Sequence, residues 1–141
     1  MSEQVIEVLW ADDDSRSLLA PLKRRLARHN LDVVRATNYA QALALLKERN
    51  FPALLVDIIL PRADDRVGLS AYRGLDLARD AAELGVLYIT FLTVVQPSEV
   101  DTEFERLKAD YKKKKVKFSY FDKTQLLEPG TRDRIARSLK P

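Results

Sequence analysis

The chain has no cysteine, and this absence excludes several kinds of protein. Without cysteine there can be neither a disulfide framework nor a site in which thiolates bind a metal ion. Long apolar runs are also absent, and the longest runs are far too short to cross a bilayer as a helix. The N-terminus lacks the basic start and apolar core of a signal peptide. We therefore expect a cytoplasmic protein that makes no membrane contact.

Histidine is scarce as well, with one residue among 141, and this speaks against a zinc site. What the chain does contain is typical of a globular protein, since 46% of its residues are apolar and 32% are charged. The sequence shows no repeats and no interdomain linker. Its length suits one core, so we expect a single domain over residues 1–141 with no output domain on this chain.

The net charge of +3 conceals an uneven distribution along the chain. Residues 1–105 hold 12 Lys and Arg against 17 Asp and Glu, whereas residues 106–141 hold 12 against 4. The basic part includes the run Lys112–Lys115, and the simplest interpretation of that run is a solvated helix end. No aromatic or glycine-rich RNA-binding pattern accompanies the lysines, so nucleic acid is not the expected partner.

Short apolar runs alternate with amphipathic segments along the chain. Five runs suit buried parallel strands, and they are Val5–Ala11, Leu31–Arg35, Ala53–Asp57, Val86–Thr93 and Val116–Phe121. Five helices are expected between and after these strands. The first has Leu18, Leu19, Leu22 and Leu26 on one face, the second follows Asn38 as its N-cap, and the third covers Tyr72–Leu84. The fourth is opened by Pro97, with Ser98 and Asp101 as a capping box, and the fifth covers Thr131–Leu139. This alternation predicts an α/β fold with a doubly wound parallel sheet covered on both faces.

The first predicted strand runs into three consecutive carboxylates in the stretch VLWADDD, Val8–Asp14. Adjacent carboxylates repel one another, and the repulsion grows where water is scarce. Asp14 or Ser15 could be the N-cap of the following helix, with the other acids in its favourable dipole field. That interpretation explains one acid well, and the other two need a neutralising cation.

Polar side chains also end the other predicted strands. The strand ends carry Asp12 and Asp13, Asp57, Thr93 and Lys123. Because the functional crevice of an open parallel sheet lies at the carboxyl ends of its strands, these side chains should converge on one edge. Oxygen ligands without histidine or cysteine suit Mg²⁺, or Mn²⁺ in its place. A carboxylate such as Asp57 beside that ion is well placed to attack a phosphoryl group, with Lys123 neutralising the developing charge.

Taken in order, the motifs VLWADDD, LLVDIILP, ITFLT and YFDK resemble the receiver domain of two-component response regulators over nearly the whole chain. The resemblance implies the flavodoxin-like, CheY-like fold with strand order 2-1-3-4-5. It implies that Asp57 accepts a phosphoryl group from a phosphohistidine of a sensor histidine kinase or phosphotransfer protein. It also implies that Asp13, Asp57 and the backbone carbonyl of Ile59 bind Mg²⁺ directly, with Asp12 close by or acting through water.

The resemblance further implies a switch. Thr93 becomes the switch hydroxyl, Lys123 the lysine of the site, and Tyr120 the aromatic on the fifth strand that changes rotamer. A downstream protein then reads the face of the fourth helix, fifth strand and fifth helix. Because these elements fall in the basic part of the chain, we expect that face to attract an acidic protein surface.

The chain departs from the receiver pattern in three places. Val94 follows Thr93 where the family usually has a small residue, and its branched side chain could narrow the path to Asp57. Thr124 follows Lys123 where the family usually has proline after a cis bond; a non-proline cis bond costs about 2.5–4 kcal/mol, so we expect a trans bond that could place Lys123 differently. The connection between Pro61 and Gly74 is longer than usual. It is expected to be an ordered surface loop beside the site, and the alternative is a lid or a partner-specific contact.

Two other functions compete with a phosphorylated receiver. The first is a degenerate receiver that never turns over phosphate and acts as a constitutive docking module, which Val94 and Thr124 favour and the complete set of acids, threonine and lysine opposes. The second is a haloacid-dehalogenase-like phosphatase, which also uses an aspartate at a strand end. That class needs a second acid two residues after the nucleophile, and Ile59 occupies this position, so we reject it.

Overall fold

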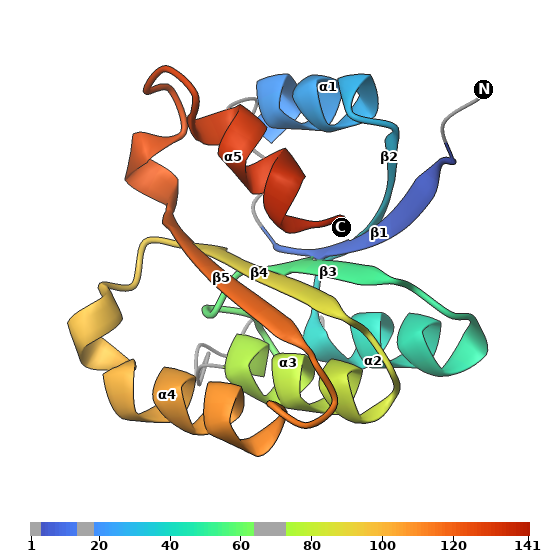
Figure 1. Ribbon diagram of the computed structural model, residues 1–141, viewed down its shortest axis with the longest axis vertical. Helices are drawn as coiled ribbons and strands as arrows, with labels where there is room; N and C mark the ends of the chain where they lie inside the picture. The colour runs from blue at the N-terminus through green and yellow to red at the C-terminus, as the bar shows by residue number, and fades with distance from the viewer. Residues whose placement is uncertain (1–3, 14–18, 64–72) are drawn as a thin grey trace.

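The computed structural model describes residues 4–13, 19–63 and 73–141, and in these ranges five parallel strands form one sheet (Figure 1). The strands are β1 (Ile6–Ala11), β2 (Leu31–Ala36), β3 (Ala53–Val56), β4 (Tyr88–Thr93) and β5 (Lys117–Asp122). The helices are α1 (Ala20–Arg28), α2 (Tyr39–Glu48), α3 (Arg73–Glu83), α4 (Asp101–Asp110) and α5 (Thr131–Ser138), with short 3₁₀ helices η2 (Pro97–Glu99) and η3 (Lys123–Gln125). The strand ends lie within two residues of the predicted ones.

The strand order is β2-β1-β3-β4-β5, which confirms the doubly wound sheet with order 2-1-3-4-5. The strands are in register where they end: Ala11 lies opposite Ala36 on one side and Val56 on the other. Val56 in turn pairs with Phe91, two residues before the end of β4. The residues that follow β1 and β3 therefore leave the same edge of the sheet side by side.

The helices cover both faces of the sheet, with α1 and α5 on one face and α2, α3 and α4 on the other (Figure 1). On the first face, Leu22 and Leu26 of α1 pack with Ile135 of α5 around the fully buried Trp10. Burying an apolar side chain of this size contributes about 1.5–3 kcal/mol. In the described ranges no helix combines the length and apolar character needed to cross a bilayer.

The helix starts test the predicted caps. Asn38 is the N-cap of α2, as predicted, and its side chain accepts a hydrogen bond of 2.8 Å from the backbone N–H of Gln41. The capping box predicted at Ser98 and Asp101 is wrong, because Gln96 and Glu99 form it around η2. Proline is favoured at the first helical position, so the cap is the residue before Pro97. Asp14, Ser15 and Leu18 lie outside the described residues, and so does most of the loop predicted between Pro61 and Gly74.

Candidate functional site

Four polar side chains meet at the carboxyl edge of the sheet, as the strand ends predict. Asp12 follows β1, Asp57 follows β3, Thr93 ends β4 and Lys123 follows β5. All four are buried, with exposed fractions of 0% for Asp12, 6% for Asp57, 0% for Thr93 and 4% for Lys123. Buried charges are costly unless paired, so the contacts among these groups determine what the site can do.

The carboxylate of Asp57 is held by three donors. Its Oδ1 atom accepts hydrogen bonds from Thr93 Oγ1 at 2.7 Å and from the backbone N–H of Ile59 at 3.0 Å. Its Oδ2 atom accepts from Lys123 Nζ at 2.9 Å. The backbone N–H of Asp57 donates to the carbonyl of Ala11 at 3.0 Å, which continues the strand pairing and fixes the side chain at the edge.

The ammonium group of Lys123 joins the two buried carboxylates. It lies 2.8 Å from Asp12 Oδ2 and 2.9 Å from Asp57 Oδ2. Burial alone would lower the pKa of Lys123, but the charge and hydrogen bonds of Asp12 and Asp57 outweigh burial and raise it above the ordinary 10.5. A raised lysine pKa means that the stabilising contribution is complete below the ordinary value and is lost only as the pH rises through the folded value. Lys123 therefore carries its positive charge at neutral pH.

Lys123 reaches the site without a proline after it. The bond between Lys123 and Thr124 is trans, as expected for a residue other than proline. Asp122 caps the start of η3, since its Oδ1 atom accepts hydrogen bonds from the backbone N–H of Thr124 at 2.9 Å and from its Oγ1 at 2.7 Å. These hydrogen bonds hold the pKa of Asp122 below its usual value. With a trans bond after Lys123, this turn directs the side chain of Lys123 to Asp57.

The donors at this edge suit a hard cation. Asp12, Asp57 and Lys123 together carry one more negative than positive charge, and Asp13 adds an exposed carboxylate beside them. Within the described part of the chain no three His, Cys, Asp or Glu side chains form a cluster that could by itself hold a metal ion. Mg²⁺ usually takes only one or two protein carboxylates and completes its shell with water, so this donor set fits it.

A chain of contacts links Thr93 to α4. The backbone N–H of Val95 donates to Thr93 Oγ1 at 3.3 Å, and the hydroxyl of Tyr120 donates to the carbonyl of Val95 at 2.6 Å. The ring of Tyr120 lies 5.6 Å from that of Phe104 on α4, in an edge-to-face arrangement. Val94, between Thr93 and Val95, is 46% exposed, so its side chain lies at the rim of the site.

The face of α4, β5 and α5 was expected to be basic and to attract an acidic protein surface. For α4 this expectation is wrong. Helix α4 carries four acids against two basic residues, namely Asp101, Glu103, Glu105 and Asp110 against Arg106 and Lys108. The run Lys112–Lys115 is exposed and directly follows Tyr111, the C-cap of α4, which confirms the predicted solvated helix end. It lies in the turn before β5, at the opposite end of that strand from Lys123. The Nζ atom of Lys114 donates a hydrogen bond of 3.3 Å to Glu83 Oε2 of α3. The lysine run therefore belongs to the far end of the sheet.

Two residues at the site were missed by the sequence analysis. Gly74, in the first turn of α3, packs directly against the end of β3, where a Cβ atom would lie 2.1 Å from the carbonyl oxygen of Asp57. Arg35, at the end of β2, donates to the carbonyl of Asp12 at 3.0 Å and lies 4.8 Å from the ring centre of Trp10. Glycine inside a helix costs about 1 kcal/mol relative to alanine, so Gly74 itself was a signal of close approach.

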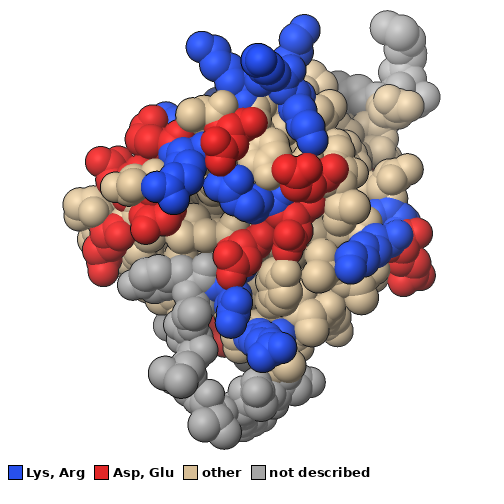
Figure 2. Space-filling view, turned by 90° about the horizontal axis from the view of Figure 1, so that it is seen from below, with Lys and Arg blue, Asp and Glu red and all other residues tan. Residues whose placement is uncertain are grey.

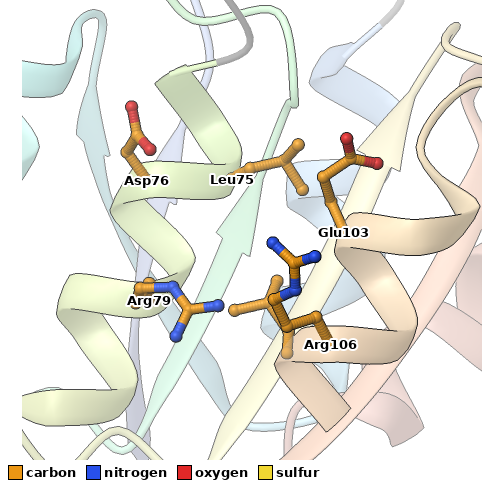
Figure 3. A pocket seen from close by; sticks show the side chains of 6 residues that line it. Leu75, Asp76, Arg79, Glu103 and Arg106 are labelled. Carbon is orange, nitrogen blue, oxygen red and sulfur yellow. The ribbon is translucent and has the colours of Figure 1, made fainter. Parts of the chain in front are cut away.

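A separate cavity of about 360 Å³ lies between α3 and α4 (Figure 3). It is lined by Leu75, Asp76, Arg79, Glu103, Arg106 and Leu107. Figure 3 shows the guanidinium groups of Arg79 and Arg106 in the space between α3 and α4, whereas Asp76 points away. The guanidinium group of Arg79 donates a hydrogen bond of 2.9 Å to Asp110 Oδ2. The acidic site contributes no side chain to this cavity.

Known proteins match this chain in fold but not in sequence. No family model matches the chain, and no curated protein matches it. A CheY-like response regulator receiver domain from Methanospirillum hungatei JF-1 is 20% identical, with a TM-score of 0.66 over 95% of this chain and 90% of that one. The signal receiver domain of a modulated diguanylate cyclase from Desulfovibrio desulfuricans G20 is 24% identical, with a TM-score of 0.66 over 96% of this chain and 90% of that one. A response regulator from Burkholderia pseudomallei, with a phosphorylated aspartic acid, calcium ion and citrate, is 22% identical, with a TM-score of 0.66 over 96% of this chain and 66% of that one.

Proposed function

Because the chain has the fold of response regulator receiver domains, we propose that it is a receiver that accepts a phosphoryl group on Asp57. The donor is a phosphohistidine of a sensor histidine kinase or a histidine phosphotransfer protein, and the chain works as a stand-alone regulator in the cytoplasm. The main support is the set of donors around Asp57, from Thr93, Ile59 and Lys123. Such a protein assists its own phosphorylation and dephosphorylation and turns over no other substrate.

The transfer needs a nucleophile and donors for the developing charge. An oxygen of Asp57 attacks the phosphorus, the bond between phosphorus and the histidine nitrogen breaks, and the electron pair returns to that nitrogen. Lys123 and Thr93 then donate to the phosphoryl oxygens. Asp13, Asp57 and the carbonyl of Ile59 would hold Mg²⁺ directly, with Asp12 close by or acting through water. The ion, or Mn²⁺ in its place, supplies positive charge beside the transferred group.

Labelling with a small phosphodonor tests the proposal. Incubated with labelled acetyl phosphate and Mg²⁺, the wild type should gain an acid-labile phosphoryl group, and omission of Mg²⁺ should reduce the gain strongly. Asp57→Asn should gain none, because an amide is a poor nucleophile. Asp32→Asn, an exposed position near the start of β2, is the matched control and should label like the wild type. Label that persists in Asp57→Asn would place the acceptor elsewhere.

A degenerate receiver that acts as a constitutive docking module is the competing function. Val94 at the rim of the site still favours it, because a branched side chain there could impede the approach of a donor. Thr124 no longer favours the docking module, because Lys123 reaches Asp57 although the bond between Lys123 and Thr124 is trans. A wild type that is folded and binds Mg²⁺ but takes no label from acetyl phosphate would favour this alternative.

The signal would pass from Asp57 to α4. A new dianion on Asp57 attracts Thr93 and Lys123, which releases the Val95 backbone and frees Tyr120 to change rotamer. Since Tyr120 packs on Phe104, this change alters how α4 lies on the sheet. We expect a downstream protein to read the face of α4, β5 and α5 in one of these two states.

Hydrogen exchange along α4 checks this path. Phosphorylation with acetyl phosphate should speed amide exchange in α4 of the wild type, because the contact between Tyr120 and Phe104 is loosened. In Tyr120→Ala the exchange of α4 should be nearly the same with and without phosphorylation. Tyr88→Ala, on a strand but without a contact to Phe104, should behave like the wild type. An α4 that exchanges equally in both forms of the wild type would contradict the path.

A further inference from the structure

Helices α1 and α5 lie side by side on one face of the sheet and form a continuous surface (Figure 1). Asp133 of α5 joins them, since its Oδ1 atom lies 3.6 Å from Arg25 and 3.0 Å from His29 Nε2. Lys140 adds a second link, because its Nζ atom donates to the carbonyl of His29 at 3.0 Å. Residues 20–30 and 131–141 are called the α1–α5 surface below.

The α1–α5 surface is strongly basic. It carries eight Lys or Arg residues and one acid, a balance of +7. The whole chain carries +3, so all other residues together carry −4. The basic residues are Lys23, Arg24, Arg25, Arg28, Arg132, Arg134, Arg137 and Lys140. The fold produces this cluster, because half of it comes from α1, in the part of the sequence that is acidic on balance.

Several cations of this surface are available to a ligand. The one acid, Asp133, already has partners on α1, and the hydrogen bond from His29 together with the nearby arginines holds its pKa below the usual value. Lys23, Arg24 and Arg28 are exposed and form no hydrogen bond or ion pair within the described ranges. The opposite face, over α3 and α4, mixes acidic and basic side chains (Figure 2).

We propose that the α1–α5 surface binds the phosphate backbone of nucleic acid without reading its sequence. Six of its eight cations are arginine, whose planar group donates two parallel hydrogen bonds to a phosphate. An amphipathic helix that binds a membrane needs an apolar face. The large apolar side chains exposed in the described chain lie on neither α1 nor α5, and they are Val5, Leu84, Leu87, Val94 and Leu127. A surface with many cations and no exposed large apolar side chain is suited to neutralise the phosphates of a nucleic-acid backbone.

The pattern around Lys112–Lys115 does not predict nucleic acid, and the proposed surface is a different one. Binding of nucleic acid to the α1–α5 surface does not depend on the chemistry of Asp57. Asp57→Asn should therefore bind nucleic acid like the wild type, which separates a failure of the phosphoacceptor proposal from a failure of this one.

Fluorescence anisotropy with a labelled duplex DNA of mixed sequence tests the surface. Five exposed cations, Lys23, Arg24, Arg28, Arg134 and Arg137, are expected to neutralise about five phosphates, so a plot of log affinity against log salt should have a slope of about −4.5. The double variant Arg24→Glu/Arg28→Glu should lose about 100-fold in affinity at moderate salt. Lys112→Glu/Lys113→Glu changes the net charge by the same amount at the far end of the sheet. It should lose less than about threefold, because screening acts beyond about 8–10 Å.

Each other outcome overturns the proposal. Equal losses in the two double variants, with both melting like the wild type, would mean that net charge and not this surface attracts DNA. Competition by poly-glutamate as strong as that by unlabelled DNA would identify an acidic protein partner. Tighter binding to phosphatidylserine vesicles than to DNA would identify a membrane surface. Absence of DNA binding at low salt would remove the surface as a nucleic-acid site.

Discussion

Replacing Lys123 by methionine is expected to lower the free energy of unfolding by about 3–5 kcal/mol in buffer without Mg²⁺. The reason is the burial of the carboxylates it joins, since Asp12 is 0% exposed and Asp57 is 6% exposed. Methionine has a similar length but no charge, so both carboxylates would keep their burial and lose the ammonium group that lies 2.8 Å and 2.9 Å away. Removing one partner of a buried ion pair costs more than the pair contributes, because the remaining charge is left uncompensated.

Urea denaturation measures this loss, and Lys117→Met is the matched control. Lys117 is exposed at the start of β5, so the same substitution there should change stability by no more than about 0.5 kcal/mol. Mg²⁺ should restore more stability to Lys123→Met than it adds to the wild type, because the variant has two carboxylates that need a cation. If Mg²⁺ stabilises neither protein, the acids do not hold the ion. If Lys123→Met is as stable as Lys117→Met without Mg²⁺, the buried triad is not what keeps the site together.

Replacing Gly74 by alanine is expected to cost about 3 kcal/mol and to slow the labelling of Asp57. The added Cβ atom would lie 2.1 Å from the carbonyl oxygen of Asp57 and 2.6 Å from Cα of Ile58. Both are backbone atoms, so neither can move away by a change of rotamer. The start of α3 must therefore shift from the end of β3, which strains the hydrogen bond from Gly74 N–H to the carbonyl of Ile58, at 3.0 Å.

Gly85→Ala is the matched control for this prediction. Gly85 has φ of +96°, and a Cβ atom there meets nothing within 4 Å. Alanine at this position adds only the backbone strain of a positive φ, about 1–2 kcal/mol, far from the site. It should leave the rate of labelling unchanged. A Gly74→Ala protein that is as stable as Gly85→Ala and labels at the wild-type rate would show that the close approach to Asp57 has no consequence.

The strand ends explain how much of the site could be predicted from the sequence. Asp12, Asp57, Thr93 and Lys123 each follow or end an apolar run, and parallel strands bring such positions to one edge whatever their side chains. Strand bounds were predictable for the same reason, since each run is bordered by polar or turn residues.

The contacts that were missed depend on distances between segments far apart in the sequence. Arg35 lies on Trp10 because β2 pairs with β1 in one register, and a shift of one residue would place it on the other face. The charge of the α1–α5 surface arises only when helices from the two ends of the chain pack together. Counting charges along the sequence divides these residues between an acidic part and a basic part, and so hides the surface.

The most direct test of Asp57 as the phosphoacceptor is to map the modified residue chemically. After incubation with acetyl phosphate and Mg²⁺, borohydride reduces an aspartyl phosphate to the alcohol, so the acceptor becomes homoserine and can be located by mass spectrometry. We expect homoserine at position 57 and at no other aspartate, in an amount that matches the phosphoryl group gained. Homoserine at position 12 or 13, or an unchanged Asp57 in protein that carries the phosphoryl group, would contradict the assignment.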